Sequence, residues 1–400
     1  MAQSFSTKKY FSKLFAHQLL SELAQKHNTQ LFFEINDQTP RKLAVELMED
    51  SVKSMDTDNR INFLKDLSYI SSITNSHSAT LGKKLFKNET GKDFEPEVEC
   101  ATDTDVVLYF FLRHNDIADK LSFLTPFYSS KSYFGYEARK MEKVESEVNL
   151  TELEREFEKL ANKDNATEFA AENMYLENVL YIESIFHGAY DVGNKMDVVT
   201  GEMSRKHISR KIEVVRIAYI PQEEIVLISG NIPMSKKLIF LDTFLRIMFG
   251  TGYEEKVESY NLAPLRDLSI DFTKYNKDTP FIKAHITSTT FSYAKGKKKL
   301  RISVPSSIDK TNMQALQETL NELGLQEKFN SFEIMNMSFK FIFQNKEKID
   351  KSVSVTCSLS PTRASLCPLF EYELYTKKIL KNAGIYEGFK LPESEKATRT

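Results

Sequence analysis

The residue types best suited to catalysis gather between positions 183 and 197. This stretch contains Glu183, His187, Asp191 and Asp197, and histidine and carboxylate side chains are ligands that hydrolytic metal sites use. His187 could also act as a general base, with Asp191 orienting its ring. Because the spacing matches no established metal motif, we favour a simpler interpretation. A strand would run into a glycine-containing turn, and the polar side chains would satisfy backbone groups there.

A second group of carboxylates precedes an apolar run that begins at Val106. Its members are Glu95, Glu97, Glu99, Asp103 and Asp105. Paired acids on a strand edge could bind Mg²⁺, but a metal-nuclease core would also need an acid and a lysine one residue apart on a following strand. We find no such arrangement in the sequence. We therefore expect a solvated loop followed by a helix, with the acids at the positive end of the helix dipole.

Two basic segments could contact the phosphates of nucleic acid. The first precedes a predicted hairpin and the second forms the tip of another. Their members are Arg205, Lys206, Arg210 and Lys211 in the first, and Tyr293, Lys295, Lys297, Lys298, Lys299 and Arg301 in the second. Lysine and arginine neutralise phosphates, and a tyrosine can stack on a base. Lysine-rich tips also keep sheet edges soluble, which is the simpler interpretation of each segment taken separately, and location of both segments on one face would make binding the better interpretation.

The sequence lacks the motifs of the common enzyme classes. It contains no phosphate-binding loop, no dinucleotide-binding glycine pattern after a strand, no H-E-x-x-H and no G-x-S-x-G. These absences argue against conventional ATPases, dinucleotide dehydrogenases, zinc proteases and α/β-hydrolases. We predict no cofactor, except a divalent metal if the stretch around His187 is a hydrolytic site.

Composition indicates a globular protein of the reducing cytoplasm. The 400 residues are 41% hydrophobic and 28% charged, and the net charge of −2 provides no general attraction to nucleic acid or membranes. The amino-terminal sequence has no signal-peptide character, and the longest apolar run, Val106–Leu112, is too short to cross a bilayer. The three cysteines are expected to be inert, although Cys367 lies near a predicted helix start that could stabilise a thiolate.

Hydropathy patterns divide the chain into a helical part and a part rich in hairpins. The predicted domains are a mostly helical domain over 1–140, an acidic helical connector over 141–178, a first α+β domain or half over 179–260, a C-terminal α+β domain over 261–390 and a disordered tail over 391–400. The segment 103–112 is ambiguous between a strand and a helix. We favour a helix because two acids stand at its start.

Three predicted units in the second part each consist of a hairpin followed by a helix. The expected elements are strands 211–220 and 224–229 with helix 235–249, then strands 282–293 and 300–304 with helix 310–323, then strands 335–343 and 353–359 with a helix that Ser365 would cap and Gly384 would follow. Such units predict an α+β fold of mainly antiparallel sheet covered by helices. Whether they form one sheet or two stays open.

The third hairpin has the clearest pattern. Phe339, Phe341 and Phe343 alternate with polar residues, and Val355 and Cys357 alternate in the partner strand. A period of two places one face of a sheet in the core and the other in water. We therefore predict that these residues are buried and that their neighbours form a polar face.

These observations favour a non-catalytic cytoplasmic binding or scaffold protein that acts in a complex with protein or nucleic acid, including a bacterial accessory role such as phage defence. A protein partner or a homo-oligomer is expected, nucleic acid would bind at the basic hairpin tips, and no membrane association is expected. One alternative is a metal-dependent hydrolase or nuclease centred on His187, Asp191 and Asp197. Another is a structural homo-oligomer.

Overall fold

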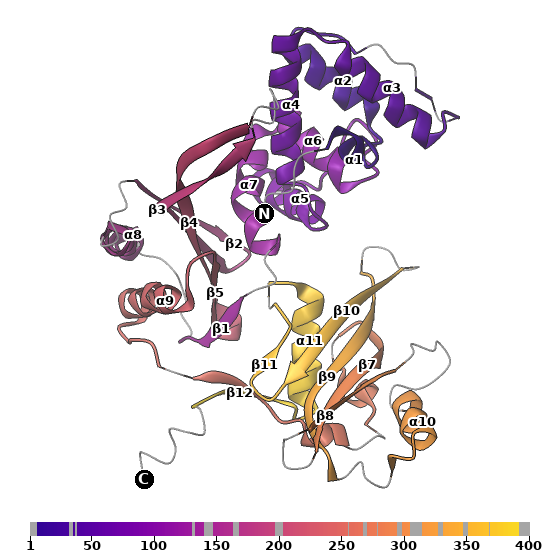
Figure 1. Cartoon of the computed structure of the whole chain (residues 1–400), viewed down its shortest axis with the longest axis vertical. Coiled ribbons are helices and arrows are strands. Elements are labelled where there is room, and N and C mark those ends of the chain that lie inside the picture. The colour runs from indigo at the N-terminus through magenta and orange to yellow at the C-terminus, as the bar shows by residue number, and fades with distance from the viewer. Residues whose placement is uncertain are drawn as a thin grey trace. The chain divides into compact units, whose positions relative to one another are not determined.

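Figure 1 shows the computed structural model of the chain, which divides into two compact units, residues 1–130 and 131–400. It describes residues 6–31, 35–36, 38–129, 133–139, 147–162, 168–196, 203–254, 256–266, 270–277, 279–293, 298–304, 314–326, 331–346, 351–367 and 369–391. For 147–149, 162, 188–196, 203–210, 293 and 314–315 only the backbone is described. The fold is α+β, as predicted, and the finer domain boundaries stay predictions. The predicted disordered tail lies almost wholly outside the described residues.

The first unit is built from helices, as its hydropathy predicts. Their bounds are α1 Thr7–Phe11, α2 His17–Lys26, α3 Arg41–Lys53, α4 Thr57–Ser72, α5 Ser78–Thr90, α6 Asp103–Arg113 and α7 Asn115–Ser129. Helix α6 confirms the choice of helix over strand, and its residues from Thr104 to Phe111 are all buried. Within the residues that the structure describes, no helix combines the length and the apolar character that a bilayer-spanning segment requires.

Asp105 connects the start of α6 to the segment between α1 and α2. Its side chain accepts a hydrogen bond from the backbone N–H of Thr102, in a capping box. Its other oxygen accepts from the backbone N–H groups of Phe15 at 2.7 Å and Ala16 at 2.9 Å. The carboxylate is fully buried, so these donors have no alternative partner in water. The expectation that the acids at this position cap a helix is confirmed for Asp105.

Replacing Asp105 with alanine is expected to destabilise the first unit by about 2 kcal/mol, because it leaves buried backbone donors without an acceptor. Urea denaturation followed by circular dichroism measures the change. The matched control is Asp103→Ala, which removes a half-buried carboxylate with one long hydrogen bond, 3.3 Å, to the backbone N–H of Ala79. An equal loss in both variants would show that the buried hydrogen bonds are not what matters.

The second unit begins with a five-stranded antiparallel sheet in the order β1-β5-β4-β3-β2. Its elements are β1 Phe134–Glu137, α8 Glu147–Asn162, β2 Phe169–Leu176, β3 Val179–Met196, β4 Met203–Ile220, a 3-10 turn η1 Pro221–Glu223, β5 Ile225–Gly230 and α9 Met234–Phe249. Helices α8 and α9 pack on one face, where Phe240 contacts Phe157 at a ring-centroid distance of 4.9 Å and Phe186 at 5.7 Å. The predicted hairpin and helix over 211–249 are confirmed.

Two expectations for this region were wrong. The sequence predicts a helical connector over the whole of 141–178. In the structure, residues 169–176 of this segment form strand β2 instead. Helix α8 buries Leu153 and Phe157 in the core of the sheet because its apolar stripe needs a surface to cover. The predicted turn after His187 is also absent from the described chain, since β3 continues to Met196 with register irregularities next to its glycines.

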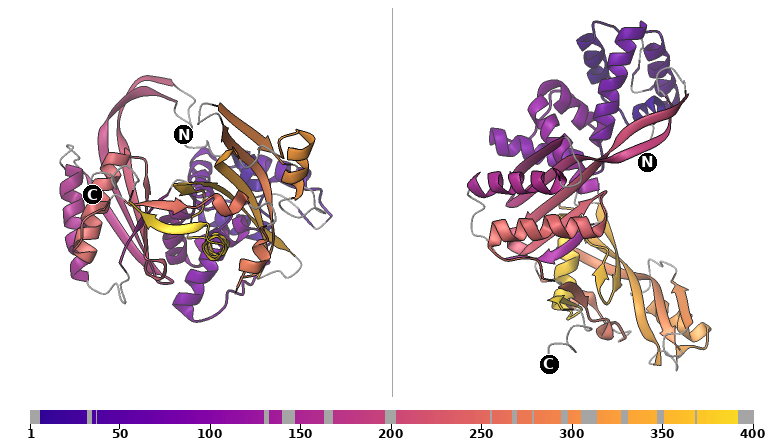
Figure 2. Two further views of the ribbon diagram at one scale, coloured as in Figure 1. Left: turned by 90° about the horizontal axis from the view of Figure 1, so that it is seen from below. Right: turned by 60° about the vertical axis from the view of Figure 1, so that its left-hand side comes forward.

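Strands β3 and β4 extend past the rest of their sheet. Beyond His187 on β3 and before Val214 on β4, the two strands pair only with each other, because β2 ends its pairing at Phe186 and β5 begins its pairing at Val215. The result is a curved two-stranded ribbon (Figures 1 and 2). The first basic segment of the sequence lies on it.

A second five-stranded antiparallel sheet occupies the C-terminal part, in the order β11-β10-β9-β7-β8. Its elements are β7 Phe281–Tyr293, β8 Lys298–Ser303, α10 Gln314–Glu322, β9 Glu333–Gln344, β10 Ser352–Ser360, β11 Arg363–Ala364 and α11 Glu371–Asn382. Short elements accompany them, namely β6 Val257–Tyr260 paired with β12 Tyr386–Lys390, and the 3-10 turns η2 Ala263–Arg266 and η3 Phe272–Tyr275. The hairpins therefore form separate sheets, which the sequence left open.

The core of this sheet confirms the predicted alternation. Phe339, Phe341 and Phe343 are fully buried, and Phe341 lies opposite Val355 in the register. Helices α10 and α11 contribute to the same core. The expected cap of the last helix was wrong, since α11 begins at Glu371 and Ser365 instead accepts a hydrogen bond from the backbone N–H of Ser358.

Candidate nucleic-acid interface

The face of the C-terminal sheet opposite its core is mostly polar and positively charged, with Ile342 between Lys283 and Ser354 in the register. Register places Lys340 directly opposite His285 on one side and Thr356 on the other, while Arg301 and Asn336 both lie opposite Thr290. We call the following residues the polar face: Lys283, His285, Thr287, Thr290, Lys299, Arg301, Asn336, Ser338, Lys340, Ser354, Thr356 and Ser358. Lys299, Arg301, Ser354 and Thr356 are exposed.

The charge of this sheet differs from that of the whole chain. Its strands contain six lysines and arginines and one acid, Glu333. The basic residues are Lys283, Lys298, Lys299, Arg301, Lys340 and Arg363. The full chain has 54 basic and 56 acidic residues, so the imbalance is local. A surface with this imbalance attracts polyanions although the protein as a whole does not.

Hydrogen bonds among small polar side chains order the middle of the polar face. The hydroxyl groups of Ser338 and Ser358 lie 3.0 Å apart, and Ser358 donates to the Asn336 side-chain oxygen at 3.1 Å. Thr287 donates to the backbone carbonyl of Ser338 at 3.2 Å. These groups are neutral donors and acceptors between cationic residues, a combination typical of surfaces that contact phosphate and sugar.

His285 is the titratable group at the centre of the polar face. Its burial lowers the pKa of its imidazole below the ordinary value of 6.5, and the positive charges of Lys283 and Lys340 lower it further. The imidazole is therefore neutral at neutral pH. The negative charge of a bound polyanion would favour the protonated imidazole and offset the effect of the two lysines, so binding would be coupled to proton uptake.

We expect affinity for a polyanion to rise several-fold as the pH falls from about 7.5 to about 5.5, and His285→Gln to remove most of that rise. Fluorescence anisotropy of a labelled oligonucleotide at constant ionic strength measures it. The stability of the free protein should change in the opposite direction. Because the pKa of His285 is lowered in the folded state, the unfolded chain binds the proton more readily, and the folded state becomes less stable as the pH falls below 6.5. An unchanged pH dependence in the variant would contradict the assignment.

The structure places the two predicted basic segments on different sheets of the second unit. In the second segment, Lys298, Lys299 and Arg301 are exposed on the edge strand β8, Tyr293 ends β7 opposite Lys298, and Lys295 and Lys297 lie outside the described residues. In the first segment, Lys211 is exposed on β4. The backbones of Arg205, Lys206 and Arg210 belong to the ribbon, with Arg210 opposite Tyr190.

The predicted catalytic and metal residues have other partners where they are described. His187 Nε2 lies 2.9 Å from Glu168 Oε2, and Glu183 forms an ion pair with Arg216 directly opposite it. Burial raises the pKa of the Glu183 carboxyl, and Arg216 opposes this rise. The backbone of Asp191 lies opposite Ser209, on the order of 10 Å along the strand from His187.

Asp197 lies outside the described residues, as does any metal site that would need it. Among the side chains that the structure describes, no three histidines, cysteines or acids come close enough together to hold a metal ion. The side chain of Asp191 also lies outside the described residues, so the hydrolase alternative stays a prediction. Sequence reasoning missed Glu168 and Arg216 as partners because both pairings depend on strand register.

The cysteines offer no reactive thiolate. Burial raises the pKa of the Cys367 thiol to about 12 and that of Cys100 to about 11, and it raises the pKa of Cys357 as well. Cys357 lies in the core, as predicted. The helix start that could have stabilised a Cys367 thiolate begins later, at Glu371.

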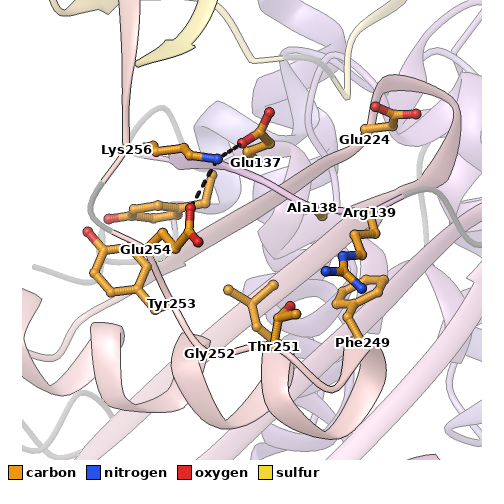
Figure 3. A pocket seen from close by; sticks show the side chains of 12 residues that line it. Glu137, Ala138, Arg139, Glu224, Phe249, Thr251, Gly252, Tyr253, Glu254 and Lys256 are labelled. Carbon is orange, nitrogen blue, oxygen red and sulfur yellow. Dashed lines mark hydrogen bonds and ion pairs between the residues drawn. The ribbon is translucent and has the colours of Figure 1, made fainter. Parts of the chain in front are cut away.

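A pocket of about 420 Å³ lies beside the C-terminal end of α9 (Figure 3). In it Lys256 is held between Glu137 at 2.6 Å and Glu254 at 3.1 Å, and these partners raise the pKa of its ammonium group. Arg139 lies on the other side, near Phe249. Because acids and bases alternate around it and Lys256 is already paired, this pocket has less capacity for a polyanion than the polar face.

Comparison of the chain with protein-family models, curated proteins and solved structures found no match.

Proposed function

We propose that this protein binds nucleic acid without catalysing a reaction, through contacts between the polar face and the phosphate backbone. The observation that supports the proposal is that the strands of this sheet contain six basic residues and one acid, and that four of the basic residues, Lys283, Lys299, Arg301 and Lys340, belong to the polar face. Neutralising phosphates with lysine and arginine supplies most of the affinity of non-specific binding.

The dimensions of the polar face suit a single strand. Lys299 on β8 and Thr356 on β10 are separated by three strand spacings, roughly 14 Å. That width accommodates a few nucleotides across the sheet, as in other sheets that bind single-stranded nucleic acid. The described side chains of the polar face include no phenylalanine or tyrosine on which bases could stack. We therefore expect affinity with little preference for base sequence.

The test is fluorescence anisotropy with labelled single-stranded DNA, single-stranded RNA and duplex DNA. Between about 50 and 200 mM salt, the logarithm of the binding constant should fall linearly with the logarithm of salt concentration. Absence of binding at the lowest salt, or an affinity that salt does not change, would contradict the proposal. Incubation of the same oligonucleotides with Mg²⁺ or Mn²⁺ tests the alternative, because a nuclease would shorten them.

A further inference from the structure

Two cationic side chains of the second unit lie against one phenylalanine ring. The Lys237 ammonium lies 5.9 Å and the Arg363 guanidinium carbon 5.5 Å from the centre of the Phe134 ring. Among the residues that the structure describes, neither cation has an ion-pair partner. The three residues come from α9, β11 and β1, so the fold brings them together from distant parts of the sequence.

Lys237 is the unusual member of this group. Lys237 is only 8% exposed, and this burial lowers the pKa of its ammonium group. A buried lysine is ordinarily paired with an acid, because an isolated charge is costly to remove from water. Glu258, which lies beside Gly135 of β1, is bound at 2.7 Å by a different lysine, Lys377.

The first turn of α9, in which Lys237 is the fourth residue, adds positive potential beside this lysine. The helix begins at Met234 after Pro233, which makes no side-chain capping bond. Lys237 lies on the buried face of this turn. Phe134 pairs with Ile228, close to the end of β5 from which the chain enters α9. A helix N-terminus with an adjacent lysine and arginine is the arrangement that proteins use to bind phosphate.

We propose that Lys237, Arg363 and the N-terminal turn of α9 form a binding site for a phosphate group, either free or carried by a nucleotide. The site is independent of the polar face and does not require the proposed nucleic-acid binding. Phe134, which is 36% exposed, forms its apolar wall. A bound phosphate would supply a counter-ion for Lys237, which has none among the residues that the structure describes.

The experiment is thermal unfolding and calorimetric titration of the full chain with inorganic phosphate, with a nucleoside monophosphate and with the matching nucleoside, at constant ionic strength. We expect both phosphate compounds, but not the nucleoside, to raise the melting temperature. A larger response to the monophosphate would assign a nucleotide as the ligand, and equal responses would assign free phosphate. Absence of a phosphate response at millimolar concentration would overturn the proposal.

Variants locate the response. Lys237→Met keeps the length of the buried side chain and removes its charge, and Arg363→Gln changes an exposed residue. Each should weaken phosphate binding about tenfold or more. Lys299→Glu on the polar face should leave it unchanged. A phosphate response that survives in both site variants would also overturn the proposal, whatever the outcome for nucleic acid.

Discussion

Replacing Phe341 with serine is expected to destabilise the second unit by about 3–5 kcal/mol. The side chain is fully buried in β9, and its ring centre lies 5.4 Å from that of Phe272, 5.8 Å from Phe339 and 6.1 Å from Phe281. Serine would leave a cavity among these rings and bury a hydroxyl group without a partner. Urea denaturation, followed by a probe of the second unit, measures the loss.

The neighbouring position provides the matched control. Ile342 is half-buried on the opposite side of the same strand, so Ile342→Ser removes a side chain that is not in the core. We expect a loss of about 1 kcal/mol or less. Equal losses at the two positions, or an unchanged midpoint for Phe341→Ser, would refute the assignment of faces on which the core and the polar face both depend.

The elements predicted correctly are those whose pattern is local and long. The alternation through Phe339, Phe341 and Phe343 allows one facing only, because a shift by one residue would expose every ring. The acids at the start of segment 103–112 predict a helix and not a strand. Asp105 forms the capping box expected at such a helix start. In both cases the local sequence and the fold favour the same structure.

The elements predicted wrongly depend on partners that are distant in the sequence. Gly188 and Gly193 indicate a turn when they are considered alone, yet β4 lies alongside and continues the strand through them. A strand is stabilised by its cross-strand pairs more than by its own residues. Helix α8 has a clear apolar stripe, but nothing in that stripe shows that α9 and the first sheet cover it.

Only part of the candidate interface could be predicted, because some of its residues are brought together by strands that are distant in the sequence. The lysines of β8 form a run in the sequence and were identified there. Lys283, His285 and Lys340 were missed, because a single basic residue in an alternating strand is the ordinary solvent-facing residue. Only the register of β7 with β9 brings them together. The alternation of Lys283 and His285 with Ala284 and Ile286 was the available signal.

Reversing the charge of the β8 edge should weaken nucleic-acid binding by about a hundredfold or more. The variant carries Lys298→Glu, Lys299→Glu and Arg301→Glu, and all three side chains are exposed, so the fold should tolerate the changes. Loss of three phosphate contacts should also reduce the slope of log affinity against log salt by about two for a single strand. Anisotropy titrations at several salt concentrations measure both quantities.

A control with the same change in net charge separates the interface from a general effect. Lys8, Lys42 and Lys83 are exposed in the first unit, and replacing all three with glutamate adds the same negative charge. If the polar face binds the phosphates, this control should lose only the small part of its affinity that long-range attraction provides. An equal loss in both triple variants would mean that net charge, and not the sheet, governs binding. Full affinity in the β8 variant would exclude this edge from the interface.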